Sequence, residues 1–384
     1  NLSGKPTEGH WTEFIMNQNA EKITNLKTEL YSFHIANGGK MVPFAGYDMP
    51  VQYSEGIIKE HQHVRSAVGI FDVSHMGQFS IFGNEKDYLA LEQIVPIDLK
   101  SLKVNQSKYS VLMNDKGGID DDLIVTKSEE GINIVLNAAC KHHDITRIHE
   151  VINPSKTKLH DNLSLIAIQG PKAVDALEVL VKGVRDLKFM TGGKFKYKDN
   201  DVYVNRSGYT GEDGFEVSLD NSVVKEFCKT LLENKEVKLI GLGARDSLRL
   251  EAGLCLYGHD LNPDISPIEA SLSWALSKIK KEEGNFLGSK IVKDQIENGV
   301  KKKRIGIKPD KVIAREGSKI FKNDKEIGIV TSGGFGPSVN GPVAMGYIMK
   351  EFANEGETLE LEVRGKKHQG KVFKMPFYKK SYVK

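Results

Sequence analysis

Short stretches in which apolar and polar residues alternate are a main feature of this 384-residue chain. Alternation with a period of two predicts strands at 77–83, 108–114, 121–127 and 132–137, and a mostly apolar run of strand length predicts another strand at 163–169. Turns that contain glycine join three of these strands, from 108 to 137, as consecutive hairpins. Helical spacing predicts helices over 26–36, 56–68 and 222–234, and another that ends near Val181. Strand pairs followed by helices indicate an α+β fold with antiparallel sheets.

The last part of the chain has a different pattern. The charged segments 278–283 and 301–304 flank a short helix and are interpreted as a linker region. After them come six short strand-like segments separated by glycine, asparagine and lysine turns, which predict a small β-barrel or sandwich. Residues 1–21 contain neither a signal-peptide core nor the arginines of a transit peptide. We expect those residues to be a tag or a disordered extension.

Composition limits the classes of function. A formal charge of +3 argues against a protein that coats nucleic acid, and no apolar run approaches the ~18 residues of a membrane span. The three cysteines are odd in number and form no CxxC pair, which excludes a disulfide framework and a zinc ribbon. A reducing compartment is expected: the cytoplasm, or the mitochondrial matrix if a transit peptide has been removed.

Three adjacent aspartates, Asp120 to Asp122, begin a predicted strand after a glycine turn. They suit a solvated acidic edge, and the segment lacks the spacing of a calcium loop. Alternatively, strand alternation turns Asp121 inward, away from Asp120 and Asp122, into a site where its pKa can be tuned.

Two further segments carry candidate binding residues. In 207–217, Tyr209 offers a stacking face and Glu216 can accept two parallel hydrogen bonds, although the segment also suits a plain glycine-rich hairpin. In 241–261, Arg245 and Arg249 lie one turn apart. They suit an ion-paired helix or, since only nine arginines accompany 45 lysines, bidentate recognition of a carboxylate.

Several enzyme signatures are missing from the sequence. The histidines show no HExxH spacing, and His75 has no neighbouring pattern of a catalytic triad. The chain also lacks a GxSxG elbow and a dinucleotide-binding fingerprint, which argues against hydrolase and dehydrogenase functions.

Seven motifs in order resemble those of the glycine cleavage T-protein family, the tetrahydrofolate-dependent aminomethyltransferases. The motifs are FAGYDMPVQY (44–53), EHQHVR (60–65), GIFDVSHMG (69–77), GGIDDDLIV (117–125), IAIQGP (166–171), GYTGEDGFE (208–216) and GLGARDSLRLEAG (241–253). The resemblance extends from about Thr28 to the end of the chain. It implies two interleaved α+β domains over 22–285, one of them ferredoxin-like, around a folate cavity, and a C-terminal β-barrel over 300–384.

The resemblance also implies roles for individual residues. The family's key carboxylate falls on Asp121, which is therefore the expected catalytic residue. The expected folate-binding residues are Glu216, Arg245, Tyr109, Asn137, Tyr209, Met76 and Tyr382.

The reaction implied by the family moves a one-carbon unit to tetrahydrofolate. The donor is an aminomethyl group on the lipoyl arm of a carrier, the H-protein, and the products are 5,10-methylenetetrahydrofolate and ammonia. The family implies no metal or flavin, and we expect no nucleic-acid or membrane partner. Because the family's carrier is acidic, lysines at 278–281 and 301–304 are candidates for a basic docking rim, although a solvated face of a lysine-rich chain is the slightly better explanation.

Two alternatives remain open at this point. One is a related folate-dependent demethylase, which the motifs at 208–216 and 241–253 do not exclude. The other is a non-enzymatic folate-binding factor that maintains iron–sulfur proteins. That group carries a KGCYxGQE motif and lacks the aspartate, whereas this chain has Asp121 and no such motif.

Overall fold

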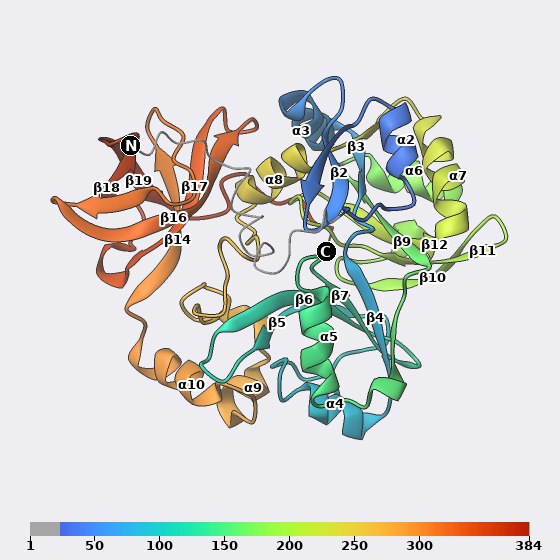
Figure 1. Cartoon of the computed structure of the whole chain (residues 1–384), viewed down its shortest axis with the longest axis horizontal. Coiled ribbons are helices and arrows are strands. Elements are labelled where there is room, and N and C mark those ends of the chain that lie inside the picture. The colour runs from blue at the N-terminus through green and yellow to red at the C-terminus, as the bar shows by residue number, and fades with distance from the viewer. Residues whose placement is uncertain (1–23, 384) are drawn as a thin grey trace.

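The computed structural model describes residues 24–383 of the chain. The expected tag or extension at 1–21 lies outside these residues. Figure 1 shows three bodies of β-structure: a sheet with helices on both faces at upper right, a second sheet below it, and a barrel at left. Among residues 24–383, no helix has the length and apolar character that crossing a membrane requires.

The first sheet has six strands, and their order reflects a break in the chain path. In spatial order they are β10 (Gly192–Tyr197), β11 (Asn200–Asn205), β12 (Gly214–Asp220), β9 (Leu163–Gln169), β3 (Val68–Asp72) and β13 (Val237–Leu239). The chain leaves this sheet after β3, builds the second sheet, and returns as β9. All neighbouring strands pair antiparallel except β13 and β3.

Helices cover both faces of the first sheet. On β9, Ile166 and Ile168 pack with residues of α2 (Tyr31–Ala36), α6 (Ala173–Leu180) and α7 (Asn221–Leu232). The alternate residues Leu165 and Ala167 pack toward α3 (Ile57–Ser66) and α8 (Leu242–Glu251). A strand buried on both faces is mostly apolar, which explains the run of four apolar residues at Leu165–Ile168. A small hairpin, β1 (Lys40–Phe44) and β2 (Tyr47–Gln52), packs beside α8.

The second sheet contains the three hairpin strands predicted from alternation. Its order is β5 (Ser107–Met113), β6 (Ile119–Lys127), β7 (Gly131–Leu136), β4 (Gly77–Phe82) and β8 (Thr157–Leu159). One face packs with residues of α4 (Glu85–Leu91) and α5 (Lys141–His149) around Leu123, Val125 and Ile134. Asn84 and Asp87 form a capping box that fixes the start of α4. The other face of β6 carries partly buried residues, among them Asp120, Asp122 and Ile124.

The C-terminal strands form a closed barrel, which confirms the first of the two architectures that the sequence left open. Around the barrel the strands are β14 (Lys302–Pro309), β17 (Gly341–Met349), β16 (Lys325–Gly336), β15 (Lys319–Lys322), β18 (Thr358–Val363) and β19 (Lys366–Phe373). Closure pairs β14 with β19 and leaves no free sheet edge. Short 3-10 turns elsewhere in the chain are η1 (Pro154–Lys156), η2 (Val184–Asp186), η3 (Ser273–Ala275) and η4 (Lys350–Phe352).

The segment interpreted as a linker is in fact ordered and packed, so that interpretation is corrected. Residues 278–283 form the helix α9 (Lys278–Glu283), and α10 (Ser289–Asn298) follows it. Lys280 is buried and its ammonium group lies 2.6 Å from Glu92, beside the second sheet. Arg304 is also buried and donates to the backbone carbonyl of Ala270 at 2.9 Å. The charge pattern suggested a solvated linker, but the charged side chains of Lys280 and Arg304 have buried partners that are distant in sequence.

Candidate active site

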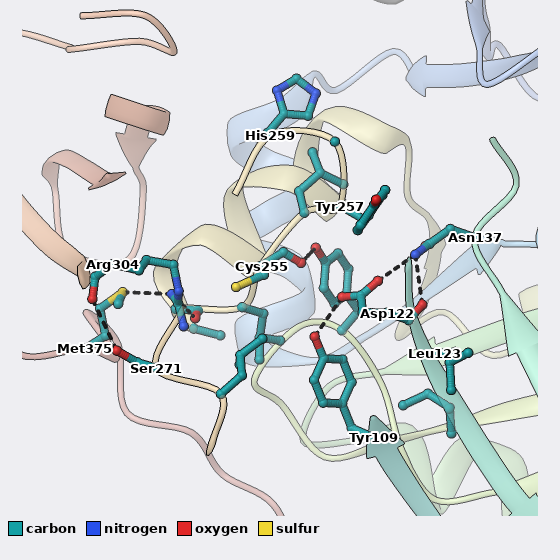
Figure 2. A pocket seen from close by; sticks show the side chains of 18 of the residues that line it. Tyr109, Asp122, Leu123, Asn137, Cys255, Tyr257, His259, Ser271, Arg304 and Met375 are labelled. Carbon is teal, nitrogen blue, oxygen red and sulfur yellow. Dashed lines mark hydrogen bonds between the residues drawn. The ribbon is translucent and has the colours of Figure 1, made fainter. Parts of the chain in front are cut away.

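A cavity of about 1380 Å³ is lined by residues from both sheets and from the barrel. This central cavity receives side chains from the second sheet, from the loops around α8 and from the barrel strand β14 (Figure 2). A volume above the usual 300–1,000 Å³ of a ligand pocket suits two substrates held together. Its lining includes Phe44, His75, Met76, Tyr109, Asp120, Asp122, Asn137, Phe189, Tyr209, Glu216, Arg245, Cys255, Tyr257, Trp274, Arg304, Lys380 and Tyr382.

Asp122 is the carboxylate at the centre of this lining. Side chains alternate along β6, so Asp120, Asp122 and Ile124 face the cavity while Asp121 faces the core and Leu123, although packed in the core, also borders the cavity. The Tyr109 hydroxyl donates to Asp122 Oδ2 at 2.8 Å, and Asn137 Nδ2 donates to Oδ1 at 2.6 Å. Figure 2 shows both bonds, which fix the carboxylate from two sides.

The pKa of Asp122 is raised to about 7. Burial is the main cause, and the charge of Asp121 on the same strand raises it further; the hydrogen bonds from Tyr109 and Asn137 act in the opposite direction. A carboxyl group with a pKa near 7 can both take up and release a proton under physiological conditions.

Asp121 lies on the other face of β6. As expected, alternation turns it away from Asp120 and Asp122, but it enters the core under α5 and does not line the cavity. Its side chain is fully buried and accepts from Asn137 Nδ2 at 2.7 Å. The expected position of the cavity carboxylate is therefore wrong by one residue, because the extra aspartate at 120 obscured the strand register.

Asp120 has a different set of partners. It accepts hydrogen bonds from Arg147 of α5 and, at 2.9 Å, from the Asn114 side chain in the β5–β6 turn. Its carboxylate is thus compensated by a cation from α5, whereas Asp122 faces the cavity without one.

Glu216 and Arg245 enter the cavity from β12 and α8. Within residues 24–383, neither side chain belongs to an ion pair and Glu216 accepts no hydrogen bond. Burial raises the pKa of Glu216, and the charge of Arg245 partly offsets this effect. The Arg245 guanidinium lies 4.8 Å from the centre of the Tyr209 ring. Two opposite charges in a buried cavity, both without a bonded partner of opposite charge, are suited to bind a polar ligand.

Aromatic rings provide the remaining walls. Tyr109 stacks on Trp274 with ring centres 5.3 Å apart, and Tyr382 stacks on Phe189 at 4.2 Å. Tyr209 donates its hydroxyl hydrogen bond to the carbonyl of Cys255. Flat apolar surfaces next to charged groups suit a ligand that combines an aromatic ring system with polar edges.

The structure brings seven of the eight predicted site residues to the cavity and places Asp121 behind it. The seven are Glu216, Arg245, Tyr109, Asn137, Tyr209, Met76 and Tyr382.

Some residues of the cavity were not among those predicted from the sequence. Asp122 could have been found by extending the period-two pattern back from Leu123. Trp274 could have been found as a large aromatic residue in a serine-rich stretch of the sequence. Its residue surface is 61% exposed in the structure.

His75 is another cavity residue whose importance the sequence did not indicate. It is buried, and its Nδ1 atom has no partner within residues 24–383. Burial is the main cause that lowers its pKa to about 4, and the charges of Arg245 and Lys141 lower it further, whereas Asp72 raises it. His75 is therefore neutral at pH 7.

No group of three or more potential ligands suited to hold a metal ion occurs in residues 24–383.

Comparison with known proteins gives consistent matches over nearly the whole chain. Residues 30–280 match the GCVT N-terminal domain family, and residues 302–379 match the glycine cleavage T-protein C-terminal barrel domain family. A mitochondrial aminomethyltransferase of Dictyostelium discoideum is 43% identical over 378 residues, which covers 93% of this chain and 94% of that protein. A mitochondrial aminomethyltransferase of Mesembryanthemum crystallinum is 44% identical, with 93% and 90% covered.

A solved structure supports the same relationship. The crystal structure of glycine cleavage system aminomethyltransferase T from Bartonella henselae superposes with a TM-score of 0.88 at 39% identity. The alignment covers 94% of this chain and 99% of that one, so the similarity includes both sheets and the barrel.

Proposed function

The chain belongs to the family of glycine cleavage aminomethyltransferases, the T-proteins, and we propose that its central cavity performs the transfer with Asp122 as the proton-transferring group. The demethylase and iron–sulfur maintenance alternatives are not favoured, because the relatives at 41–44% identity are named aminomethyltransferases. The observation that supports the site assignment is a buried carboxylate, Asp122, in the same cavity as the unpaired Glu216 and Arg245.

The reaction proposed for this cavity transfers a methylene carbon between two large substrates. One substrate is the aminomethyl group bound to a lipoyl sulfur of the H-protein, and the other is tetrahydrofolate. The carbon–sulfur and carbon–amine bonds break, and two bonds form to folate nitrogens. The two protons released from those nitrogens end on the thiol and on ammonia. The chain therefore has to hold both substrates in contact and move protons between nitrogen and sulfur.

Asp122 is suited to the proton transfers. Ionised, it can accept a proton from a folate nitrogen and stabilise positive charge next to it. Protonated, it can return that proton to the departing amine. The pKa near 7 supports both steps, and the hydrogen bonds from Tyr109 and Asn137 keep the carboxylate directed at the cavity.

Glu216 and Arg245 are suited to bind the folate. A carboxylate such as Glu216 can accept two parallel N–H bonds from the edge of a pterin, and burial makes this contact strong. Arg245 can bind a carbonyl or carboxylate of the same substrate, with Tyr209 and Met76 supporting its guanidinium. Stacked aromatic pairs on the walls suit the flat parts of the ligand. The scheme requires no metal or flavin.

The place of action follows from the carrier. The relatives described above are named mitochondrial proteins. We propose that this chain works wherever its lipoylated carrier is present, in the mitochondrial matrix if its source is eukaryotic and in the cytoplasm otherwise. Fractionation that found the chain apart from the carrier would contradict this assignment.

Two single substitutions test the assignment of the catalytic carboxylate. With aminomethyl-loaded carrier and tetrahydrofolate at pH 8, Asp122→Asn is expected to slow formation of methylenetetrahydrofolate by about 10²–10⁴-fold, since it removes the proton-accepting group. Asp121→Asn keeps the cavity carboxylate and is expected to retain at least roughly a tenth of the rate. The reverse order of effects would assign catalysis to Asp121 and overturn the proposal.

A further inference from the structure

Two buried carboxyl groups next to the active site have no role in the proposed reaction. Asp121 lies on the core side of β6 and Asp144 on the facing side of α5, and both are fully buried. Their carboxyl groups are hydrogen-bond neighbours. Three of their oxygens are buried: Asp121 Oδ2 and both carboxylate oxygens of Asp144. Within residues 24–383, no group outside this pair donates a hydrogen bond to these three atoms.

This contact requires a proton. Ionised carboxylates only accept hydrogen bonds, so two of them cannot bond to each other. Burial raises the pKa of both groups, and the charge of each acts on the other. The pair therefore holds one shared proton and a single negative charge.

The surroundings of the pair do not remove that proton. From β6, Asp120 and Asp122 add negative charge. From α5, Arg147 donates to Asp120, His143 lies 3.5 Å from the same carboxylate, and the Cys140 thiol donates to Asp121. Tyr257 approaches from the loop after α8 and keeps its hydroxyl on the carbonyl of Ile119 at 2.8 Å. The nearby guanidinium is thus engaged by Asp120, and the other neighbours favour keeping the pair protonated.

Asn137 connects the pair to the cavity. Its side-chain nitrogen donates to Asp121 Oδ1 at 2.7 Å, to Asp122 Oδ1 at 2.6 Å and to the Asp122 carbonyl at 3.1 Å. The amide has two hydrogens for these three acceptors. Asp121 behind the amide therefore helps to fix its orientation toward Asp122, which is visible in Figure 2.

We propose that Asp144 is a positioning residue for the transfer reaction: it holds the proton that keeps Asp121 an anion, and Asp121 in turn orients Asn137 toward Asp122 and places a negative charge behind it. The inference rests on the proposed role of Asp122. Asp144 itself contacts neither substrate, since it does not line the cavity.

A pair of variants at Asp144 separates this role from a purely structural one. In Asp144→Asn the new amide still donates to Asp121, so the acid limb of the pH–rate profile is expected to stay in place and kcat to change less than about threefold. In Asp144→Ala, Asp121 keeps the hydrogen bond from Asn137 but loses the proton held by Asp144, and in its buried site it takes up a proton itself. The repulsion on Asp122 is then lost, and the limb is expected to move about one pH unit lower with kcat reduced about tenfold. A limb unchanged in Asp144→Ala would overturn the proposal.

A measurement without catalysis tests the shared proton directly. Unfolding the wild-type protein between pH 6 and 8 ionises both carboxyl groups and so releases the shared proton, whereas Asp144→Asn has no such proton to release. Calorimetry in buffers of different ionisation enthalpy is expected to find one proton fewer for the variant. Equal proton release would show that the pair holds no proton and would overturn the proposal.

The Asp122→Asn variant and the proton count test different proposals, so the failure of one can be told from the failure of the other. If Asp122→Asn kept the acid limb, the proposed role of Asp122 would be wrong, while the proton count would still report on Asp144.

Discussion

Asp120, Asp121 and Asp122 are neighbours in sequence, but their carboxylates have different partners in the structure. Asp120 bonds to Arg147, Asp121 shares a proton with Asp144 in the proposal above, and Asp122 faces the cavity. Strand alternation separates the middle residue from the other two, and the cation from α5 separates Asp120 from Asp122. The three residues are of one type, so the direction of each side chain and the group that it contacts decide the role of each aspartate.

Arg245 and Glu216 are predicted to control folate affinity. Arg245→Lys replaces a planar fork by a point charge, and Glu216→Gln removes a charge; each is expected to raise the Kd for tetrahydrofolate about 10- to 100-fold, equivalent to about 1.5–3 kcal/mol. The rate at saturating folate should fall much less. Titration calorimetry measures these affinities. The control is Arg315→Lys, which makes the same substitution at an exposed residue and is expected to leave the affinity for folate unchanged. Unchanged affinity in both site variants would contradict the assignment.

At the scale of elements, the strands match their sequence prediction closely because alternating patterns and apolar runs each extend over several residues. The run at 163–169 is the strand β9, and the 222–234 helix is α7, displaced by one residue at its start. The predicted helix 26–36 is shorter, since α2 begins at Tyr31 and its N-cap residue, Leu30, offers no side-chain acceptor. Termini were harder to predict than elements because they depend on local hydrogen bonds.

The turn between β5 and β6 is predicted to tolerate no side chain at Gly118. A Cβ atom there would lie 1.7 Å from the carbonyl oxygen of Pro263, a residue of the cavity wall. Gly118→Ala is therefore expected to lower the free energy of unfolding by about 1–3 kcal/mol and to reduce activity as the wall moves. In Gly334→Ala, the added methyl meets its nearest atom at 3.9 Å, so denaturant unfolding should change little. Equal stability of the two variants would show that the turn can relax.

Asp72 is predicted to make the N-terminal segment sensitive to acid. It accepts from Thr28 at 2.6 Å and is 2.8 Å from His34 Nε2 of α2, so it ties this segment to β3. Burial alone would raise its pKa, but His34, Thr28 and Ser74 lower it to about 2. The depressed pKa contributes stability above pH 4, about 2.5 kcal/mol, which is lost as the pH falls from 4 to 2.

Asp72→Asn provides the matched control for this acid sensitivity. The variant should be less stable at pH 7, and its free energy of unfolding should change less than that of the wild type between pH 4 and 2. Parallel curves for the two proteins over that range would contradict the prediction.

At the scale of the whole molecule, the cavity exists because three bodies of structure meet. Arg249 of α8 bonds to Asp260 at 2.8 Å, and Ser332 of the barrel strand β16 bonds to the same carboxylate. Arg304 of β14 reaches back to the carbonyl of Ala270. Buried charged contacts of this kind fix the barrel against the first sheet, because breaking one leaves an unpaired charge in the interior.

The whole-molecule arrangement also decides which lysines are placed to attract the acidic carrier that the family implies. Lys280 is paired with Glu92 in the interior, whereas Lys301, Lys302 and Lys303 are exposed and Lys303 lines the cavity. Changing these three lysines to Gln is predicted to weaken carrier binding at low salt and to reduce its dependence on salt, since steering fades over a Debye length of roughly 8 Å at physiological ionic strength.

A triple change of Lys225, Lys229 and Lys235 to Gln is the matched control. It removes the same charge from residues that do not line the cavity. Binding to the carrier across a salt series distinguishes the two proteins. Identical slopes would mean that net charge, and not a rim at the cavity, governs the attraction.

The sequence by itself determined the element types, the C-terminal barrel and most of the cavity residues, because alternation, glycine turns and family motifs are local signals. Glu216, Arg245 and Tyr209 were recognised in this way, and each lines the cavity. Tertiary structure decided which of the three adjacent aspartates line the cavity, since that depends on the pairing of β5, β6 and β7 and on the helix that covers one face. It also decided that Lys280 is buried and that Asp144 meets Asp121. Those contacts join residues distant in sequence, and the charge state of each group is set by burial and by partners that a linear pattern does not contain.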